Sequence, residues 1–106
     1  FNNCSKLHTL YCYHNPLTSL PNFNNYPNLE LLHCSNNQLT SLPDLTYCPD
    51  LQYLYCSNNH LTELPVSIMN CSRLLSIEYL NNHIELSPQI ALFIQRIKRC
   101  YTKRSD

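Results

Sequence analysis

Apolar and polar residues alternate in four short stretches of this chain, and the order of residue types is nearly the same in each. The first three stretches repeat at a shift of 22 residues and the fourth at 23, so equivalent positions are held by Leu7, Leu29, Leu51 and Leu74. Within each stretch the apolar side chains recur with a period of two, which is typical of a half-buried β-strand. A fixed period of this length predicts one short unit stacked on copies of itself.

An asparagine follows each predicted strand, at the point where the period of two ends; these residues are Asn15, Asn37, Asn59 and Asn82. Backbone groups enclosed at such a turn need partners. An asparagine side chain offers both donors and an acceptor, so we predict that this column bonds its own loop and the next coil. The chain has no glycine, and we expect its left-handed residues among the Asn pairs at 24–25, 36–37, 58–59 and 81–82.

Leu-Pro pairs follow each of the first three turns, at 20–21, 42–43 and 64–65. Because proline cannot donate to a continuing backbone ladder, the return part of each coil is predicted to be extended and irregular. An apolar residue in each return segment is expected to point inward, namely Phe23, Leu45 and Ile68. Each coil is then expected to close near Tyr26, Cys48 or Cys71.

Two of these segments carry a recognisable motif, YCSNNHLTELP from Tyr55 to Pro65 and HCSNNQLTSLP from His33 to Pro43. They resemble leucine-rich repeats of the short L-P type, similar to repeats in giant-virus proteins and bacterial secreted effectors. The resemblance covers roughly residues 1–88, with Leu80 and Ser87 as departures. It implies an α/β-type repeat solenoid with a short parallel β-sheet on the concave face, an irregular extended convex side and a C-terminal capping helix.

We therefore expect residues 1–88 to form four leucine-rich repeats, the first preceded by a partial coil. Phe1 falls in the column of Phe23 and Leu45, so the chain is expected to start in mid-coil, as the C-terminal piece of a longer array or as a truncated form. Residues 89–106 are expected to form an amphipathic basic capping helix and tail.

Six of the seven cysteines fall in inward columns, and these are Cys4, Cys12, Cys34, Cys48, Cys56 and Cys71. A free cysteine packs as a small apolar residue. No Cys-x-x-Cys pair and no Cys/His set with zinc spacing is present, so we expect neither a metal nor a cofactor. An odd number of cysteines favours a reducing compartment. We therefore expect an intracellular, cytoplasmic location, and the cytoplasm of a host cell is one such location. Glycosylation sequons at Asn3 and Asn70 would favour a secretory location, but each has an inward-column cysteine in its middle, so we interpret them as incidental in an Asn-rich sequence.

The repeat pattern ends at Pro88, where a helical apolar stripe begins, made of Ile90, Phe93, Ile94, Ile97 and Tyr101. Ser87 is suited to cap this helix, with Pro88 at its first position. Since the last coil would otherwise expose its apolar end, the stripe is expected to cover that end.

Charge is unevenly distributed although the net charge is zero. Five of the seven basic residues lie in the last eleven positions, namely Arg96, Lys98, Arg99, Lys103 and Arg104. Within this segment Ile94, Gln95, Arg99 and Arg104 have the spacing of an IQ motif, with Cys100 in place of the usual glycine. The segment thus resembles a degenerate calmodulin-binding helix, an alternative to the cap because one stripe cannot serve both purposes. Binding of nucleic acid by so small a basic cluster is less favoured, and no stretch is apolar enough to span a membrane.

The outward strand positions are left free by the packing, and they include a group of aromatic residues and one acid: Tyr11, Tyr13, His33, Tyr53, Tyr55 and Glu78. Exposed aromatic side chains are enriched in binding hot spots, although tyrosine also favours strands for its own sake. No catalytic set stands out, so we expect a non-enzymatic module that binds a protein or peptide on its Tyr-rich concave face. The alternative is a substrate-recognition fragment of a larger effector such as a ubiquitin ligase.

Overall fold

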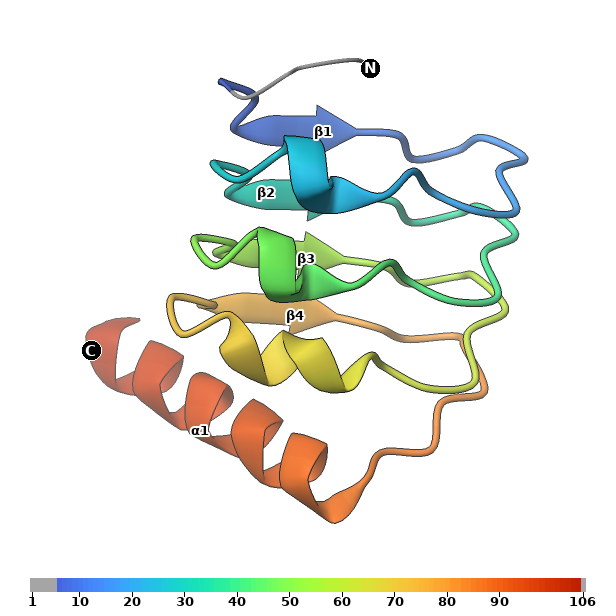
Figure 1. The fold of residues 1–106 in the computed structure, drawn as a ribbon. Helices are drawn as coiled ribbons and strands as arrows, with labels where there is room; N and C mark the ends of the chain where they lie inside the picture. Colours follow the sequence, from blue (N-terminus) through green and yellow to red (C-terminus); the bar gives the residue numbers. More distant parts are fainter. Residues whose placement is uncertain (1–5, 106) are drawn as a thin grey trace.

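The computed structural model describes the backbone of residues 6–105 and the side chains of residues 6–99. In this part of the chain four three-residue strands form one sheet: β1 (Thr9–Tyr11), β2 (Leu31–His33), β3 (Tyr53–Tyr55) and β4 (Ser76–Glu78). The strands are parallel and their order in the sheet follows the chain, so that each coil stacks on the one before it (Figure 1). The predicted alternation of strand residues is confirmed, since the middle residue of each strand is buried.

The return segments are more regular than the sequence pattern predicted. Each contains a short 3-10 helix: η1 (Phe23–Asn25), η2 (Leu45–Tyr47) and η3 (Val66–Asn70). The expectation of an extended, irregular return side is wrong for these segments. In η1 and η2 a polar side chain directly after the proline caps the turn, whereas η3 follows Pro65 and has no side-chain cap. Asn22 Oδ1 accepts a hydrogen bond from the Asn24 N–H at 2.8 Å, and Asp44 Oδ1 accepts one from the Thr46 N–H at 2.9 Å. The extra residue of the third coil is accommodated in η3, which has five residues instead of three.

The inward columns form one continuous core. Phe23, Leu45 and Ile68 are fully buried, as are the expected closing residues Tyr26, Cys48 and Cys71. Cys34 and Cys56 are also buried and Cys12 is half-buried, whereas Cys4 lies outside the described residues. The cysteines among residues 6–99 are free thiols. The repeat therefore uses them as small apolar side chains.

Burial of these thiols changes their acidity. Desolvation raises the pKa of Cys56 to about 12 and, with smaller contributions from Cys71 and Asp44, that of Cys48 to about 12. It raises the pKa of Cys71 to about 11, and it also raises that of Cys34. Since the thiolate is the nucleophilic form, these four side chains are unreactive near neutral pH.

The predicted asparagine ladder is confirmed for Asn37, Asn59 and Asn82, although each bonds the previous coil and not the next. Among the described residues Asn15 bonds its own loop. Asn37 Nδ2 donates to the carbonyl of Cys34 in its own coil and to that of Cys12 in the previous coil, both at 2.9 Å. Its Oδ1 accepts a hydrogen bond from the Leu17 N–H at 3.2 Å. Asn59 and Asn82 repeat this pattern one and two coils further on. Each of these side chains thus ties two coils together through backbone groups that are shielded from water.

Left-handed backbone conformations occur where the chain turns out of each strand, and only part of their placement was predicted. Asn36, Asn58 and Asn81 have φ between 57° and 60°, as expected for asparagine in a chain without glycine. The pair at 24–25 was wrongly predicted, because these residues lie in η1. In the first coil His14 takes the left-handed position, with φ of 59°.

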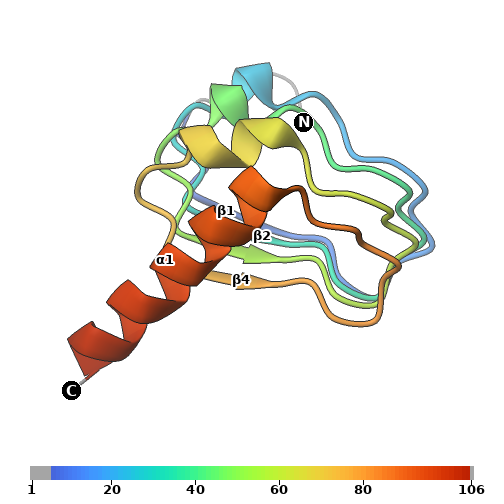
Figure 2. The ribbon, with the colours of Figure 1, turned by 90° about the horizontal axis from the view of Figure 1, so that it is seen from below.

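The C-terminal helix α1 (Pro88–Ser105) packs on the end of the stack against β4 and η3. Ser87 caps it as predicted, its Oγ accepting a hydrogen bond from the Ile90 N–H at 3.3 Å. Ile90, Ile94 and Ile97 are buried and Phe93 is half-buried, while the side chain of Tyr101 lies outside the described residues. Seen from below, α1 runs diagonally from the side of the 3-10 helices past the strands (Figure 2). The apolar end of the last coil is thereby covered.

Candidate functional site

The exposed face of the sheet brings the predicted site residues together. Strand register aligns Tyr11 with His33, His33 with Tyr55, and Tyr55 with Glu78, so these four side chains form one row across the coils. Tyr13 and Tyr53 flank that row. We call Tyr11, Tyr13, His33, Tyr53 and Tyr55 the aromatic face.

The rings of the aromatic face contact one another across three coils. Tyr13 stacks on His33 with ring centroids 4.5 Å apart and an interplanar angle of 23°. His33 in turn meets Tyr55 edge-on at 5.3 Å, and Tyr55 lies 6.3 Å from Tyr53. Tyr11 lies 6.1 Å from His33 and 6.4 Å from Tyr13. Such edge-to-face and offset pairs are favourable geometries for aromatic side chains. The result is one continuous patch of rings with His33 at its centre.

Exposure differs along this patch. Tyr11 is 61% exposed and Tyr13 is also exposed, whereas His33, Tyr53 and Tyr55 are partly covered by their neighbours. Glu78 is exposed at the β4 side of the patch. The most accessible aromatic surface therefore lies on the first coil.

Two details of this surface were not predicted. Ser35, two residues after His33 and therefore expected on the same side as the outward strand residues, is buried, since β2 ends at His33. His14 extends the patch, since its ring lies 5.3 Å from that of Tyr13. One feature of the sequence could have indicated the position of His14. It occupies the column of Asn36, Asn58 and Asn81, which is the left-handed position of each turn.

The residues with IQ-like spacing do not form an open surface. Ile94 is buried against the last coil, while Gln95 and Arg99 are exposed and the side chain of Arg104 lies outside the described residues. Lys98 Nζ lies 6.0 Å from the ring centroid of Tyr79, which also holds α1 on the repeats. For a calmodulin-like partner to grip the apolar stripe, α1 would have to leave the stack.

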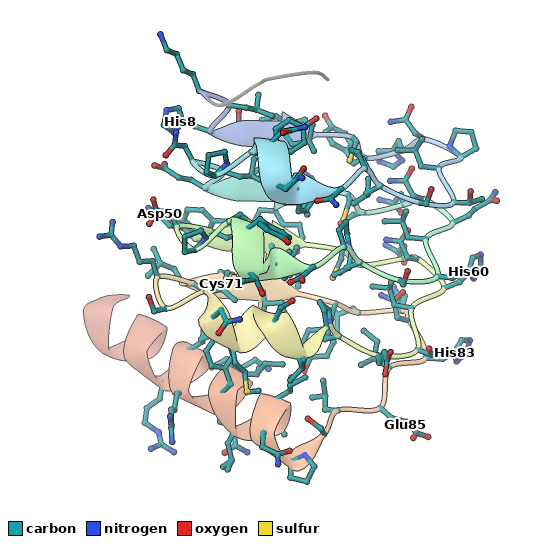
Figure 3. The ribbon with its side chains drawn as sticks, in the orientation of Figure 1. His8, Asp50, His60, Cys71, His83 and Glu85 are labelled. Atoms are coloured by element: carbon teal, nitrogen blue, oxygen red, sulfur yellow. The ribbon has the colours of Figure 1, made fainter. Side chains whose placement is uncertain are left out.

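The titratable groups elsewhere on the surface are dispersed. His60 and His83 lie at the edge of successive coils and are exposed (Figure 3). Among residues 6–99, no group of three or more His, Cys, Asp or Glu side chains is arranged to hold a metal ion. No described helix has the length and apolarity needed to cross a bilayer. What the described surface offers is a contact area built from aromatic rings.

The fold defines a class of repeat protein. Each coil adds one short strand to a parallel sheet, an inward asparagine ladder joins the coils, and a C-terminal helix covers the end of the stack. The family model described as leucine-rich repeats (two copies) matches residues 5–47 and again residues 27–82. The chain belongs to the leucine-rich repeat family, whose repeats generally mediate protein–protein interactions and whose domains are typically not enzymes. No curated protein matches the chain.

Proposed function

We propose that this chain is a protein-interaction module and that a protein or peptide docks on the aromatic face, as the concave surface of a leucine-rich repeat solenoid. The observation that supports this most is the continuous contact of rings across three coils. The core does not need these outward rings, since the inward columns already fill it. Their role as a binding surface is the simplest account of five aromatic side chains gathered on one face.

The physical chemistry of the patch suits docking. Tyrosine presents a rigid apolar ring and a polar hydroxyl, so a bound partner gains contact area at a small cost in side-chain entropy. Because the rings already pack on one another in the folded chain, their side-chain motion is already restricted, and binding a partner loses less side-chain entropy. The exposed carboxylate of Glu78 adds a negative charge at the β4 edge, which favours a partner with a basic or hydrogen-bond-donating group there.

The test is a comparison of partner recovery with matched tyrosine variants. The variant with Tyr11→Ser, Tyr53→Ser and Tyr55→Ser is used as bait beside the parent chain, with circular dichroism as the check of fold. Tyr47→Ser is the control, because Tyr47 is 48% exposed but lies in η2, on the return side of the coil. Loss of a hot-spot aromatic costs about 2 kcal/mol or more, so we expect at least a tenfold fall in affinity for the triple variant. Equal recovery by the triple variant and the Tyr47 control would refute the proposal.

We also propose that the repeats are of the short L-P type and that the protein acts in a reducing, intracellular compartment. The Leu-Pro pairs at 20–21, 42–43 and 64–65 support the first point. The free thiols at Cys12, Cys34, Cys48, Cys56 and Cys71 support the second. Protein purified from its natural source should carry no glycan at Asn70, and a glycosylated Asn70 found by mass spectrometry would contradict the assignment.

A further inference from the structure

A groove opens where the last full coil meets the start of α1, away from the aromatic face. Its volume is about 510 Å³, and its lining includes Glu63, Val66, Met69, Glu85 and Gln89. Val66 is 70% exposed there. The two acids lie on neighbouring coils, since the Glu85 N–H donates to the carbonyl of Thr62 at 3.1 Å. Neither carboxylate forms an ion pair with any side chain among residues 6–99. The groove thus combines apolar surface with two negative charges that have no cation beside them.

The outward face of α1 has the complementary character. Gln89, Leu92, Arg96 and Arg99 follow one another at spacings of three, four and three residues, which places them on one side of the helix. Leu92 is 56% exposed, although it is a large apolar residue. Arg96 and Arg99 are exposed and form no ion pair with a side chain of residues 6–99. Since Gln89 lines the groove, this face begins at the groove and continues along the helix.

We propose that the occupant of this surface is a second copy of the chain, with the two α1 helices antiparallel about a two-fold axis near Leu92. In that arrangement Leu92 of each copy packs near Leu92 of the other. Arg99 lies two turns C-terminal to Leu92, and the groove lined by Glu85 and Gln89 lies at the start of α1, on the other side of Leu92. The axis therefore brings Arg99 of each copy toward the groove of the other. The contact is self-complementary, as a two-fold interface requires.

Charge favours this occupant and this orientation. On each chain the groove carries acidic residues and the helix face carries basic residues. In a two-fold dimer the basic face of each copy therefore meets the acidic groove of the other. A parallel arrangement would place Arg96 and Arg99 of the two copies against each other, which is repulsive. Association also covers the exposed apolar side chains of Leu92 and Val66.

The proposed contact is small. With the axis near Leu92, the stretch of α1 that lies opposite its own copy runs from Pro88 to Arg96, about 13 Å of helix. Such a contact is expected to be weak, so the equilibrium is measured up to millimolar protein. Because the attraction includes ion pairs, dimerisation should weaken as salt is raised.

Sedimentation equilibrium of the 106-residue chain tests the proposal, with two leucine variants beside it. Leu92→Ser is expected to weaken dimerisation at least tenfold. Leu80→Ser is the matched control, since Leu80 is 70% exposed but follows β4 on another part of the surface. The parent chain remaining monomeric at millimolar concentration would overturn the proposal. Equal loss in both variants would also overturn it, because general stickiness of exposed leucines would then explain the association.

A charge exchange tests the register. Arg99→Glu alone and Glu85→Arg alone should each weaken self-association, because each places like charges opposite one another. An equal mixture of the two variants restores both opposite-charge contacts in a heterodimer, so it should associate at least tenfold more strongly than either variant alone. Both residues are exposed, so neither change is expected to disturb the fold, and circular dichroism serves as the check. A mixture that associates no better than its components would show that this pairing is wrong.

Discussion

Replacing Asn59 by alanine tests whether the asparagine ladder holds the coils together. Asn59 is 5% exposed. Its Nδ2 donates to the carbonyls of Cys34, Cys56 and Ser57 at 3.0–3.2 Å, and its Oδ1 accepts a hydrogen bond from the Leu39 N–H at 3.1 Å. Alanine removes all four hydrogen bonds and leaves the strand residues unchanged.

The magnitude depends on which groups lose their last partner. Each of the three carbonyls keeps another donor, namely Asn37 Nδ2, Asn82 Nδ2 and the Asn36 N–H respectively. The Leu39 N–H, in a fully buried residue, keeps none of the acceptors described for it. A buried donor without a partner costs about 1–3 kcal/mol, and the lost second donors add a smaller amount. We expect the free energy of unfolding to fall by about 2–3 kcal/mol.

Urea denaturation followed by circular dichroism measures this loss. With a slope of about 2 kcal/mol per molar urea, the midpoint should fall by about 1–1.5 M. Asn15→Ala is the control, because Asn15 holds the same column but is exposed and, among the residues that the structure describes, bonds the carbonyls of Cys12 and Tyr13 in its own loop. Its substitution should cost about 0.5 kcal/mol or less. Equal midpoint shifts in the two variants would refute the reasoning that the inter-coil bonds are the stabilising ones.

Three other predictions concern the core and the helix. Ser87→Ala should lower the free energy of unfolding by about 0.5–2 kcal/mol in the same urea assay, because the Ile90 N–H loses its cap; no change would argue against the capping bond. Ile94→Ala should cost about 2–4 kcal/mol, whereas Leu92→Ala should cost about 0.5 kcal/mol or less; the reverse order would mean that α1 packs on its other face. Stability should fall with pH above 9, since the Cys56 thiol has a pKa of about 12 when folded against 9.0 for the ordinary thiol. Both states keep the thiol proton below pH 9, and only the unfolded state releases it between pH 9 and 12. Cys56→Ala should therefore reduce the fall of the free energy of unfolding with pH in this range by about 1.4 kcal/mol per pH unit. The same pH dependence in the parent chain and the variant would contradict the burial argument.

Most of the fold was predictable because it repeats. Asn37, Asn59 and Asn82 all answer the same need, which is to bond the backbone groups enclosed at the turn of each coil. Because the need recurs, an atypical residue at one position does not hide the pattern. The same holds for the inward cysteines and for the outward row of Tyr11, His33 and Tyr55, which the strand register confirms. The helix was predictable for another reason, since Ser87 and the apolar spacing after it are local signals.

The errors fall where a local interaction overrides the column. The first two return segments form 3-10 turns in which Asn22 and Asp44 bond the backbone two residues on, a preference that the Leu-Pro pattern does not show. Ser35 is buried although it would continue the outward positions of β2, since β2 ends at His33 and the period of two ends with it.

The sequence by itself determined the unit, its period and the division of side chains into inward and outward columns, because each coil buries its apolar face in the same way. It also determined where the helix begins. The tertiary structure alone decided which rings touch, as when Tyr13 stacks on His33 from the next coil, because contact depends on strand register and side-chain direction. It also decided that Ile94 is used for packing while Leu92 stays exposed, because that choice depends on how α1 lies across the last coil.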